Sequence, residues 1–275
     1  MVQTVPQKLR VQGHELAFQR QGQGDPLLLV HGITTYGFIW RNLLPALAHH
    51  HEVVAVDLLG CGDSDMPLEE SFGILRQVEL LHDFTQALGW GPFAMVGHDI
   101  GGGITQRFAV DHPERLTHAV VMNGVGYDYW PVQPIITMRT PIVRQLAMAS
   151  LDLGAFSLIV KRGMHHKERV TAELMDLFWK PMSTRHGRKA FLHFAESLDN
   201  RHLMEISEAL RHTQIPFLIM RGMEDVYLSA EIAHRLRREI PGSLLMEFPE
   251  AGHFIQEDQP ERLVEAIESF LGKRP

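Results

Sequence analysis

The sequence predicts an α/β fold in which a mostly parallel sheet is flanked by helices. Short all-apolar runs, such as residues 26–30 and 53–56, are typical of parallel strands that are buried on both faces. These runs alternate with longer stretches of helical periodicity, such as residues 71–88. From about residue 131 to residue 210 the strands disappear, and the alternation resumes at Pro216. At 275 residues, the chain is long enough for one domain with a helical insertion.

The elements can be predicted in chain order. Residues 1–20 alternate apolar and polar side chains on either side of Gly13, which predicts two antiparallel strands at an edge of the sheet. The other expected strands are residues 26–30, 53–56, 93–96, 119–122, 217–221 and 244–248, and the expected helices are residues 40–48, 71–88 and 104–110. A last helix opens at Asp258-Gln259-Pro260-Glu261, which resembles a capping box with an early proline. The sheet is therefore expected to have eight strands.

The helical stretch divides the chain into two parts. We expect residues 1–130 and 211–275 to form the core and residues 131–210 to form a helical cap over the carboxyl edge of the sheet. Large apolar side chains recur within this stretch, as expected for the lining of a binding cavity and for a mainly hydrophobic substrate. The predicted lining residues are Phe178, Trp179, Met182 and Phe191.

Composition and charge limit the partners. A net charge of −7 gives no support for binding to nucleic acid or to an anionic membrane. No stretch approaches membrane-spanning length, and no basic start followed by an apolar run suggests a signal peptide. The single cysteine, Cys61, rules out an internal disulfide and suits a reducing compartment, so we expect a cytoplasmic protein.

The histidines and glycines do not predict a metal or a cofactor. His49-His50-His51 and His165-His166 are consecutive, which differs from the spacing of zinc ligands. The run Gly101-Gly102-Gly103 lacks both the G-x-G-x-x-G pattern and the lysine of a phosphate-binding loop. We expect no metal and no cofactor. The expected partner is a small-molecule substrate, and the sequence leaves a homodimer open.

Residues 95–103 are the centre of the predicted site. The apolar run stops at Gly97, passes through His98 and Asp99, and continues after more glycines as a helical segment. Glycines occur where a tight turn leaves no room for Cβ atoms. This strand, sharp turn and helix match the layout of a nucleophile elbow, with Asp99 at the position of the nucleophile.

Two later loops supply the partners of a nucleophile. Asp225 follows the strand expected at residues 217–221, and His253 follows the strand expected at residues 244–248. In this order of nucleophile, acid and histidine, and in its early His31-Gly32 loop, the chain resembles the α/β hydrolases over nearly its whole length. With Asp99 as nucleophile it is most similar to the branch that contains haloalkane dehalogenases, haloacetate dehalogenases and epoxide hydrolases.

The resemblance implies a two-step reaction. Asp99 would attack an sp³ carbon that carries a leaving group, which gives an ester of its own carboxylate. His253, oriented by Asp225, would then activate a water molecule that hydrolyses the ester. The backbone N–H groups of Ile33 and Ile100 would hold the negative charge that develops.

The identity of the acid has an alternative. Some dehalogenases carry the acid after the sixth strand, where Asp128 lies in this chain. We prefer Asp225, because its Gly-x-x-Asp loop fits the more common position.

The groups that would bind the leaving group are less well specified. Ile100 stands where haloalkane dehalogenases usually carry tryptophan, and Ile33 stands where many carry asparagine, so two halide donors are missing. The indole N–H of Trp130 or Trp179 could replace them. An epoxide would instead need an acid, which Tyr36 and either Tyr127 or Tyr129 could supply. Residues 131–210 contain no tyrosine, although Tyr127 and Tyr129 lie just before them.

Four functions remain open at this stage. Residues around Tyr36, Trp40 and Trp130 are more similar to haloalkane dehalogenases, so cleavage of a carbon–halogen bond leads. Epoxide hydrolysis by the same ester mechanism is the alternative. An ester, lactone or carbon–carbon hydrolase is a second class. A non-catalytic small-molecule binder on the same fold is a third.

Overall fold

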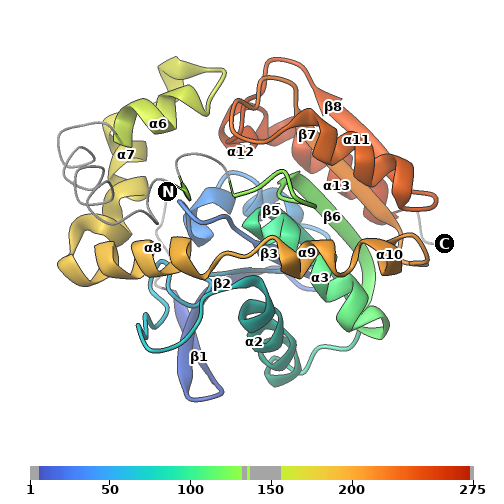
Figure 1. The fold of residues 1–275 in the computed structure, drawn as a ribbon, viewed down its shortest axis with the longest axis horizontal. Helices are drawn as coiled ribbons and strands as arrows, with labels where there is room; N and C mark the ends of the chain where they lie inside the picture. Colours follow the sequence, from blue (N-terminus) through green and yellow to red (C-terminus); the bar gives the residue numbers. More distant parts are fainter. Residues whose placement is uncertain (1–5, 132–134, 137–155, 273–275) are drawn as a thin grey trace.

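The computed structural model describes residues 6–131, 135–136 and 156–272. One sheet runs through the molecule in the order β1-β2-β4-β3-β5-β6-β7-β8 (Figure 1). The pairs β1–β2 and β2–β4 are antiparallel and all the other pairs are parallel, so the expectation of a mostly parallel eight-stranded sheet is confirmed. The strands are β1 Gln7–Val11, β2 His14–Gln21, β3 Asp25–Val30, β4 His51–Val56, β5 Phe93–Asp99, β6 Leu116–Gly124, β7 Phe217–Gly222 and β8 Leu244–Phe248.

Helices flank this sheet (Figure 1). Helix α2 packs against α3, and α1 packs against α13. The helices outside the insertion are α1 Leu44–Leu47, α2 Ile74–Ala87, α3 Ile100–Asp111, α11 Ala230–Glu239, α12 Ile255–Asp258 and α13 Pro260–Gly272, with 3₁₀ turns at Gly37–Trp40 and Pro113–Arg115. Within the described part of the chain, none of the helices is both long enough and apolar enough to cross a membrane.

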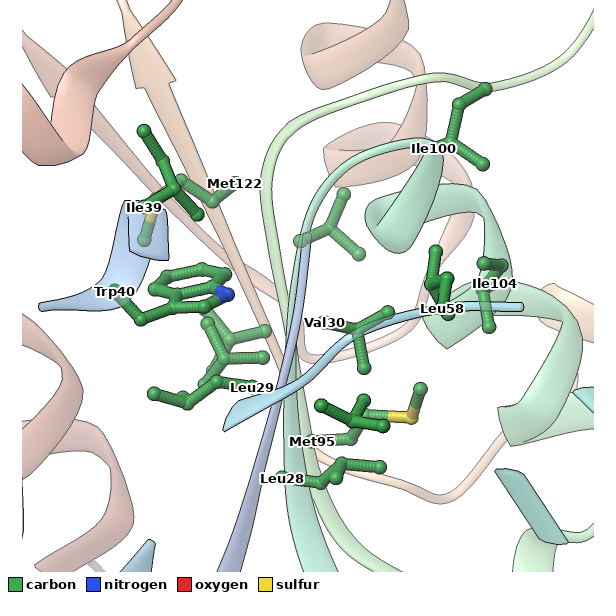
Figure 2. Packing of buried hydrophobic residues seen from close by; sticks show 14 of the residues in the cluster. Leu28, Leu29, Val30, Ile39, Trp40, Leu58, Met95, Ile100, Ile104 and Met122 are labelled. Carbon is green, nitrogen blue, oxygen red and sulfur yellow. The ribbon is translucent and has the colours of Figure 1, made fainter. Parts of the chain in front are cut away.

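The core explains why the apolar runs form the central strands. Leu28, Leu29 and Val30 of β3 are fully buried because β3 lies between β4 and β5 in the middle of the sheet. Figure 2 shows Trp40 packed beside Leu29 and Met95 of β5 near Leu28. Each such buried side chain stabilises the fold by roughly 1.5–3 kcal/mol, which outweighs the weak intrinsic preference of a short run.

Three helices differ from the expectation. Helix α2 begins at Ile74 rather than at residue 71. The stretch expected as one helix over residues 40–48 is a 3₁₀ turn, Gly37–Trp40, followed by α1, because Pro45 lies at the start of a new helix. Helix α3 begins at Ile100 rather than at residue 104. A Cβ atom at Gly101 would lie 2.3 Å from the carbonyl oxygen of Val30, so this glycine lets the helix pack directly on β3.

The chain between β6 and β7 contains helices and no strand among its described residues. They are α6 Phe156–Arg162, α7 Ala172–Trp179, α8 Arg185–Ser197, α9 Arg201–Met204 and α10 Ser207–Leu210, with 3₁₀ turns at Lys167–Arg169 and Lys180–Ser183. The cap predicted over residues 131–210 falls partly outside the described residues, and its boundaries stay a prediction.

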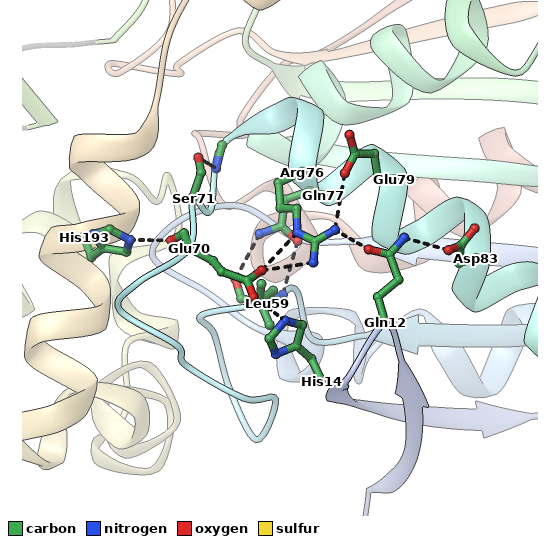
Figure 3. Close-up of polar contacts among 11 residues, drawn as sticks. Gln12, His14, Leu59, Glu70, Ser71, Arg76, Gln77, Glu79, Asp83 and His193 are labelled. Atoms are coloured by element: carbon green, nitrogen blue, oxygen red, sulfur yellow. Dashed lines mark hydrogen bonds and ion pairs between the residues drawn. The ribbon is translucent and has the colours of Figure 1, made fainter.

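A polar cluster connects this helical segment to the core (Figure 3). Glu70 pairs with Arg76 of α2 at 3.0 Å and with His14 of β2 at 2.9 Å. The backbone carbonyl oxygen of the same Glu70 accepts a hydrogen bond from His193 of α8. The loop before α2 therefore holds α8 beside the sheet.

Candidate active site

Asp99 lies at the turn between β5 and α3. Its backbone has φ 54° and ψ −117°, a left-handed conformation that is strained for a residue with a side chain. A Cβ atom at Gly97 would lie 2.0 Å from the carbonyl oxygen of Gly101, so the turn closes only because glycine stands there. The sharp turn directs Asp99 to the carboxyl edge of the sheet, as expected for a nucleophile elbow.

The Asp99 carboxylate is buried and hydrogen-bonded to backbone. The N–H of Ile33 donates to its Oδ2 at 3.1 Å, and the N–H of Ile100 also hydrogen-bonds to it. Burial raises the pKa of Asp99, while His253 and these two N–H groups oppose that shift. The two donors proposed for the oxyanion therefore already lie against the carboxylate that would form the ester.

His253 and Asp225 form a buried pair. His253 Nδ1 lies 3.0 Å from Asp225 Oδ2, and the N–H groups of Tyr227 and Leu228 donate to Asp225 Oδ1 at 2.8 and 3.1 Å. Burial disfavours the Asp225 anion, but His253 and these donors outweigh it and hold the pKa of Asp225 below its ordinary value. Asp128, the alternative acid, is exposed to solvent.

The charge state of His253 follows from its neighbours. Burial disfavours the imidazolium, but the charge and hydrogen bond of Asp225, together with the charge of Asp99, outweigh burial and raise the pKa of His253. Asp99, Asp225 and His253, the predicted nucleophile, acid and base, thus interact electrostatically with one another at the carboxyl edge of the sheet. This is the arrangement that an ester-forming hydrolase needs.

Two further side chains hold the loop that carries His253. His98 Nε2 hydrogen-bonds to the carbonyl oxygen of His253 at 2.8 Å, and Asn123 Nδ2 donates to the same oxygen at 2.9 Å. Burial lowers the pKa of His98 to about 3, so its ring is neutral. Asn123 is not among the site residues predicted from the sequence. Its signal was its place at the end of β6, beside the elbow strand.

Three of the four predicted lining residues lie together. Phe178, Met182 and Phe191 line a cavity of about 20 Å³, the space of about one water molecule, beside Ile33. The ring of Phe178 packs edge-on against the ring of Phe254, with their centroids 4.9 Å apart. Phe254 directly follows His253 in the chain. Trp179 instead packs against Phe156, with their rings 5.6 Å apart.

The residues predicted to bind or protonate the leaving group lie in different parts of the structure. Tyr36 lines a separate cavity of about 850 Å³, where its ring lies 5.3 Å from the Lys180 ammonium. The Tyr127 hydroxyl donates to Glu239 at 3.2 Å, and Tyr129 is exposed. Trp130 is buried, and its indole N–H has no hydrogen-bond partner among the described residues.

No group of three or more histidine, cysteine, aspartate or glutamate side chains is arranged to hold a metal ion in the described ranges. Three of the consecutive histidines, His51, His165 and His166, have a carboxylate partner. His51 lies 3.3 Å from Glu268, and His165 lies 2.7 Å from Glu224.

Known proteins identify the family and the fold of this chain. The sequence profile of the alpha/beta hydrolase family matches residues 27–266. The chain belongs to the alpha/beta hydrolase family. The structure of an alpha/beta hydrolase fold protein from Burkholderia ambifaria superposes with a TM-score of 0.88 at 24% identity, over 96% of this chain and 97% of that one.

Two curated relatives narrow the position within the alpha/beta hydrolase family. Haloalkane dehalogenase 2 from Mycobacterium bovis is 30% identical over 92% of this chain and 90% of its own length. A cis-3-alkyl-4-alkyloxetan-2-one decarboxylase from Shewanella oneidensis is 24% identical over 94% of this chain and 86% of its own length. The chain thus falls in the branch of haloalkane dehalogenase-like and epoxide hydrolase-like members of the family.

Proposed function

We propose that this chain is a cofactor-independent hydrolase that attacks an sp³ carbon of a small, mainly hydrophobic substrate through an Asp99 ester, in the manner of a haloalkane dehalogenase. One observation carries the proposal. A buried carboxylate at the elbow accepts hydrogen bonds from Ile33 and Ile100 and interacts electrostatically with a His253–Asp225 pair.

The reaction has two steps. In the first, an Asp99 oxygen displaces the leaving group from carbon, a step in which no proton needs to be removed from the nucleophile. In the second, His253 takes a proton from water, and the resulting hydroxide attacks the carbonyl carbon of the ester. The acyl C–O bond then breaks, the product alcohol leaves with a proton from His253, and Asp99 releases its carboxylic proton to solvent and is again a carboxylate. The Ile33 and Ile100 N–H groups stabilise the oxyanion, and Asp225 stabilises the imidazolium that forms.

The choice of leaving group rests on Trp130. Its buried indole N–H is a donor without a partner among the described residues. Trp130 follows Val125 in the chain, and the N–H of Val125 donates to the Asp99 carbonyl oxygen at 3.0 Å. None of the four tyrosines offers a comparable acid. Tyr36 lines a separate cavity, Tyr129 is exposed, and the hydroxyl groups of Tyr127 and Tyr227 donate to Glu239 and to the Ile159 carbonyl oxygen. A halide needs only such an N–H donor, whereas an opening epoxide needs a proton, so halide is favoured.

The test is to stop the reaction after its first step. A His253→Phe variant is incubated with panels of haloalkanes and epoxides, and the intact protein is weighed by mass spectrometry. We expect a stable adduct on Asp99, because attack proceeds while hydrolysis stalls. A double variant that also carries Asp99→Asn is the matched control and should gain no mass.

Wild-type products then identify the substrate class. Release of halide supports the proposal, and a diol from an epoxide supports the alternative on the same ester. The Shewanella relative adds a cis-3,4-dialkyl oxetan-2-one to the panel, since its ring also has an sp³ carbon bonded to a leaving oxygen. Turnover of simple esters without any Asp99 adduct would refute the ester mechanism.

Hydrolysis of the ester should depend on pH with a predictable sign. His253 must be neutral to accept a proton, so the rate should rise as pH increases through its pKa. That pKa is raised in the free protein, partly by the charge of Asp99. Esterification removes this charge, so the pKa of His253 should be lower in the ester than in the free protein. Single-turnover decay of the ester, measured from about pH 5 to about pH 9, checks this. A rate that falls with rising pH would contradict it.

A further inference from the structure

Asp258 connects the loop of His253 to the helical segment that precedes β7. It ends the four-residue helix α12, and it is only 2% exposed. Its Oδ2 accepts hydrogen bonds from the N–H of Gly252 at 2.8 Å and of His165 at 3.0 Å. Its Oδ1 accepts from the N–H of His166 at 2.9 Å. One carboxylate therefore holds the residue just before His253 and two residues of the loop after α6.

Further contacts join the same two segments. The N–H of Phe254 donates to the Gly163 carbonyl oxygen at 3.0 Å. A Cβ atom at Gly252 would lie 2.5 Å from that same oxygen, so the two backbones touch. From the 3₁₀ turn Lys167–Arg169, the Arg169 guanidinium donates to the carbonyl oxygens of Glu257 and Asp258 at 2.7 and 2.9 Å. Residues on both sides of His253 are thus attached to residues 163–169.

We propose that Asp258 is a positioning residue that keeps His253 aligned with Asp225 and couples this alignment to residues 163–169. The carboxylate is suited to this because both its oxygens accept, and three backbone N–H groups converge on it. An amide of the same shape has one accepting oxygen, so its NH₂ group would face an N–H donor. In one orientation of the amide this donor is the His166 N–H, and in the other the donors are the N–H groups of Gly252 and His165. Both orientations weaken the contact between the His253 loop and residues 163–169.

The inference rests on the proposed function, in which only the second step needs His253. An Asp258→Asn variant should therefore slow hydrolysis of the Asp99 ester by about 10- to 100-fold while it changes ester formation by less than about threefold, because a small displacement of a catalytic group has effects of this size. The ester should accumulate during turnover. A general loss of folding would slow both steps alike.

Three variants separate positioning from stability. Asp258→Asn removes one accepting oxygen. Arg169→Met, at an exposed position, removes the two hydrogen bonds from Arg169 Nη1 to α12 and should produce a smaller effect of the same kind. It replaces Asp258→Asn in the test if that buried variant does not fold. Glu257→Gln is the matched control, since Glu257 is buried in the same helix but pairs with Arg41. Its ester should not accumulate.

Two measurements apply to each variant. Quenched-flow intact mass spectrometry gives the rates of ester formation and decay. Carbon-13 NMR of labelled histidine gives the pKa of His253, whose signal is assigned by its loss in His253→Phe. In Asp258→Asn we expect a lower His253 pKa than in the wild type, since the imidazole moves from Asp225, and an unchanged one in Glu257→Gln.

The outcomes are distinguishable. Selective slowing of ester decay with a lowered His253 pKa supports the proposal. A wild-type His253 pKa in Asp258→Asn, or equal slowing of both steps, overturns it. If His253→Phe traps no adduct from any substrate, the proposed function fails, and the NMR titration still decides the role of Asp258.

Discussion

Replacing Asp99 by asparagine is expected to lower the rate of product formation by at least about 10⁴-fold, the scale seen when a catalytic nucleophile is removed. The amide is neutral and cannot form the alkyl ester, so neither step can proceed. Its oxygen can still accept the hydrogen bond from Ile33, so the fold should be kept. Steady-state assays of halide release measure the rate, and circular dichroism checks folding.

Asp63→Asn is the control for this change. It also neutralises an aspartate, but Asp63 forms a partly exposed pair with Lys180 at 2.7 Å, outside the His253 and Asp225 cluster. Its activity should stay within about twofold of wild type, because exposed pairs contribute little. If Asp99→Asn kept activity within about tenfold of wild type, Asp99 would not be the nucleophile.

The sequence predicted the central sheet because each inner strand is an apolar run that is buried on both faces. It predicted the elbow because glycine is needed at positions 97 and 101 by close backbone contacts, and such contacts leave a mark in the sequence. The sequence also placed Asp225 and His253 after the strands that carry them. Their 3.0 Å contact joins residues from two separate loops and could be expected only from the resemblance to a family.

Other features depend on contacts between distant segments, and no local sequence pattern predicts them. Asp258 resembles a helix cap in the sequence, but its side chain accepts from Gly252 and from the loop after α6. Tyr36 belongs to the loop after β3, yet its ring faces a cavity shared with Lys180. In both cases local pattern predicts the backbone, while the packing of remote elements decides the direction of the side chain.

The choice between Asp225 and Asp128 leads to the second large effect. Asp225→Asn should slow hydrolysis of the Asp99 ester by about 10³- to 10⁴-fold, as loss of the acid does in serine proteases, because the imidazole loses the anion that holds its tautomer and stabilises its charge. Formation of the ester should change far less, since His253 takes no part in the attack. The variant should therefore accumulate the ester, and its intact mass during turnover should show it.

Asp128→Asn should have no comparable effect. Asp128 is exposed, whereas Asp225 lies 3.0 Å from His253 and receives two backbone N–H groups, so only Asp225 is held in one orientation toward the imidazole. The two variants change charge equally, which removes net charge as an explanation for any difference between them. Slow ester decay in Asp128→Asn, with normal decay in Asp225→Asn, would transfer the role of the acid to the loop after β6 and would require that loop to move toward His253 during turnover.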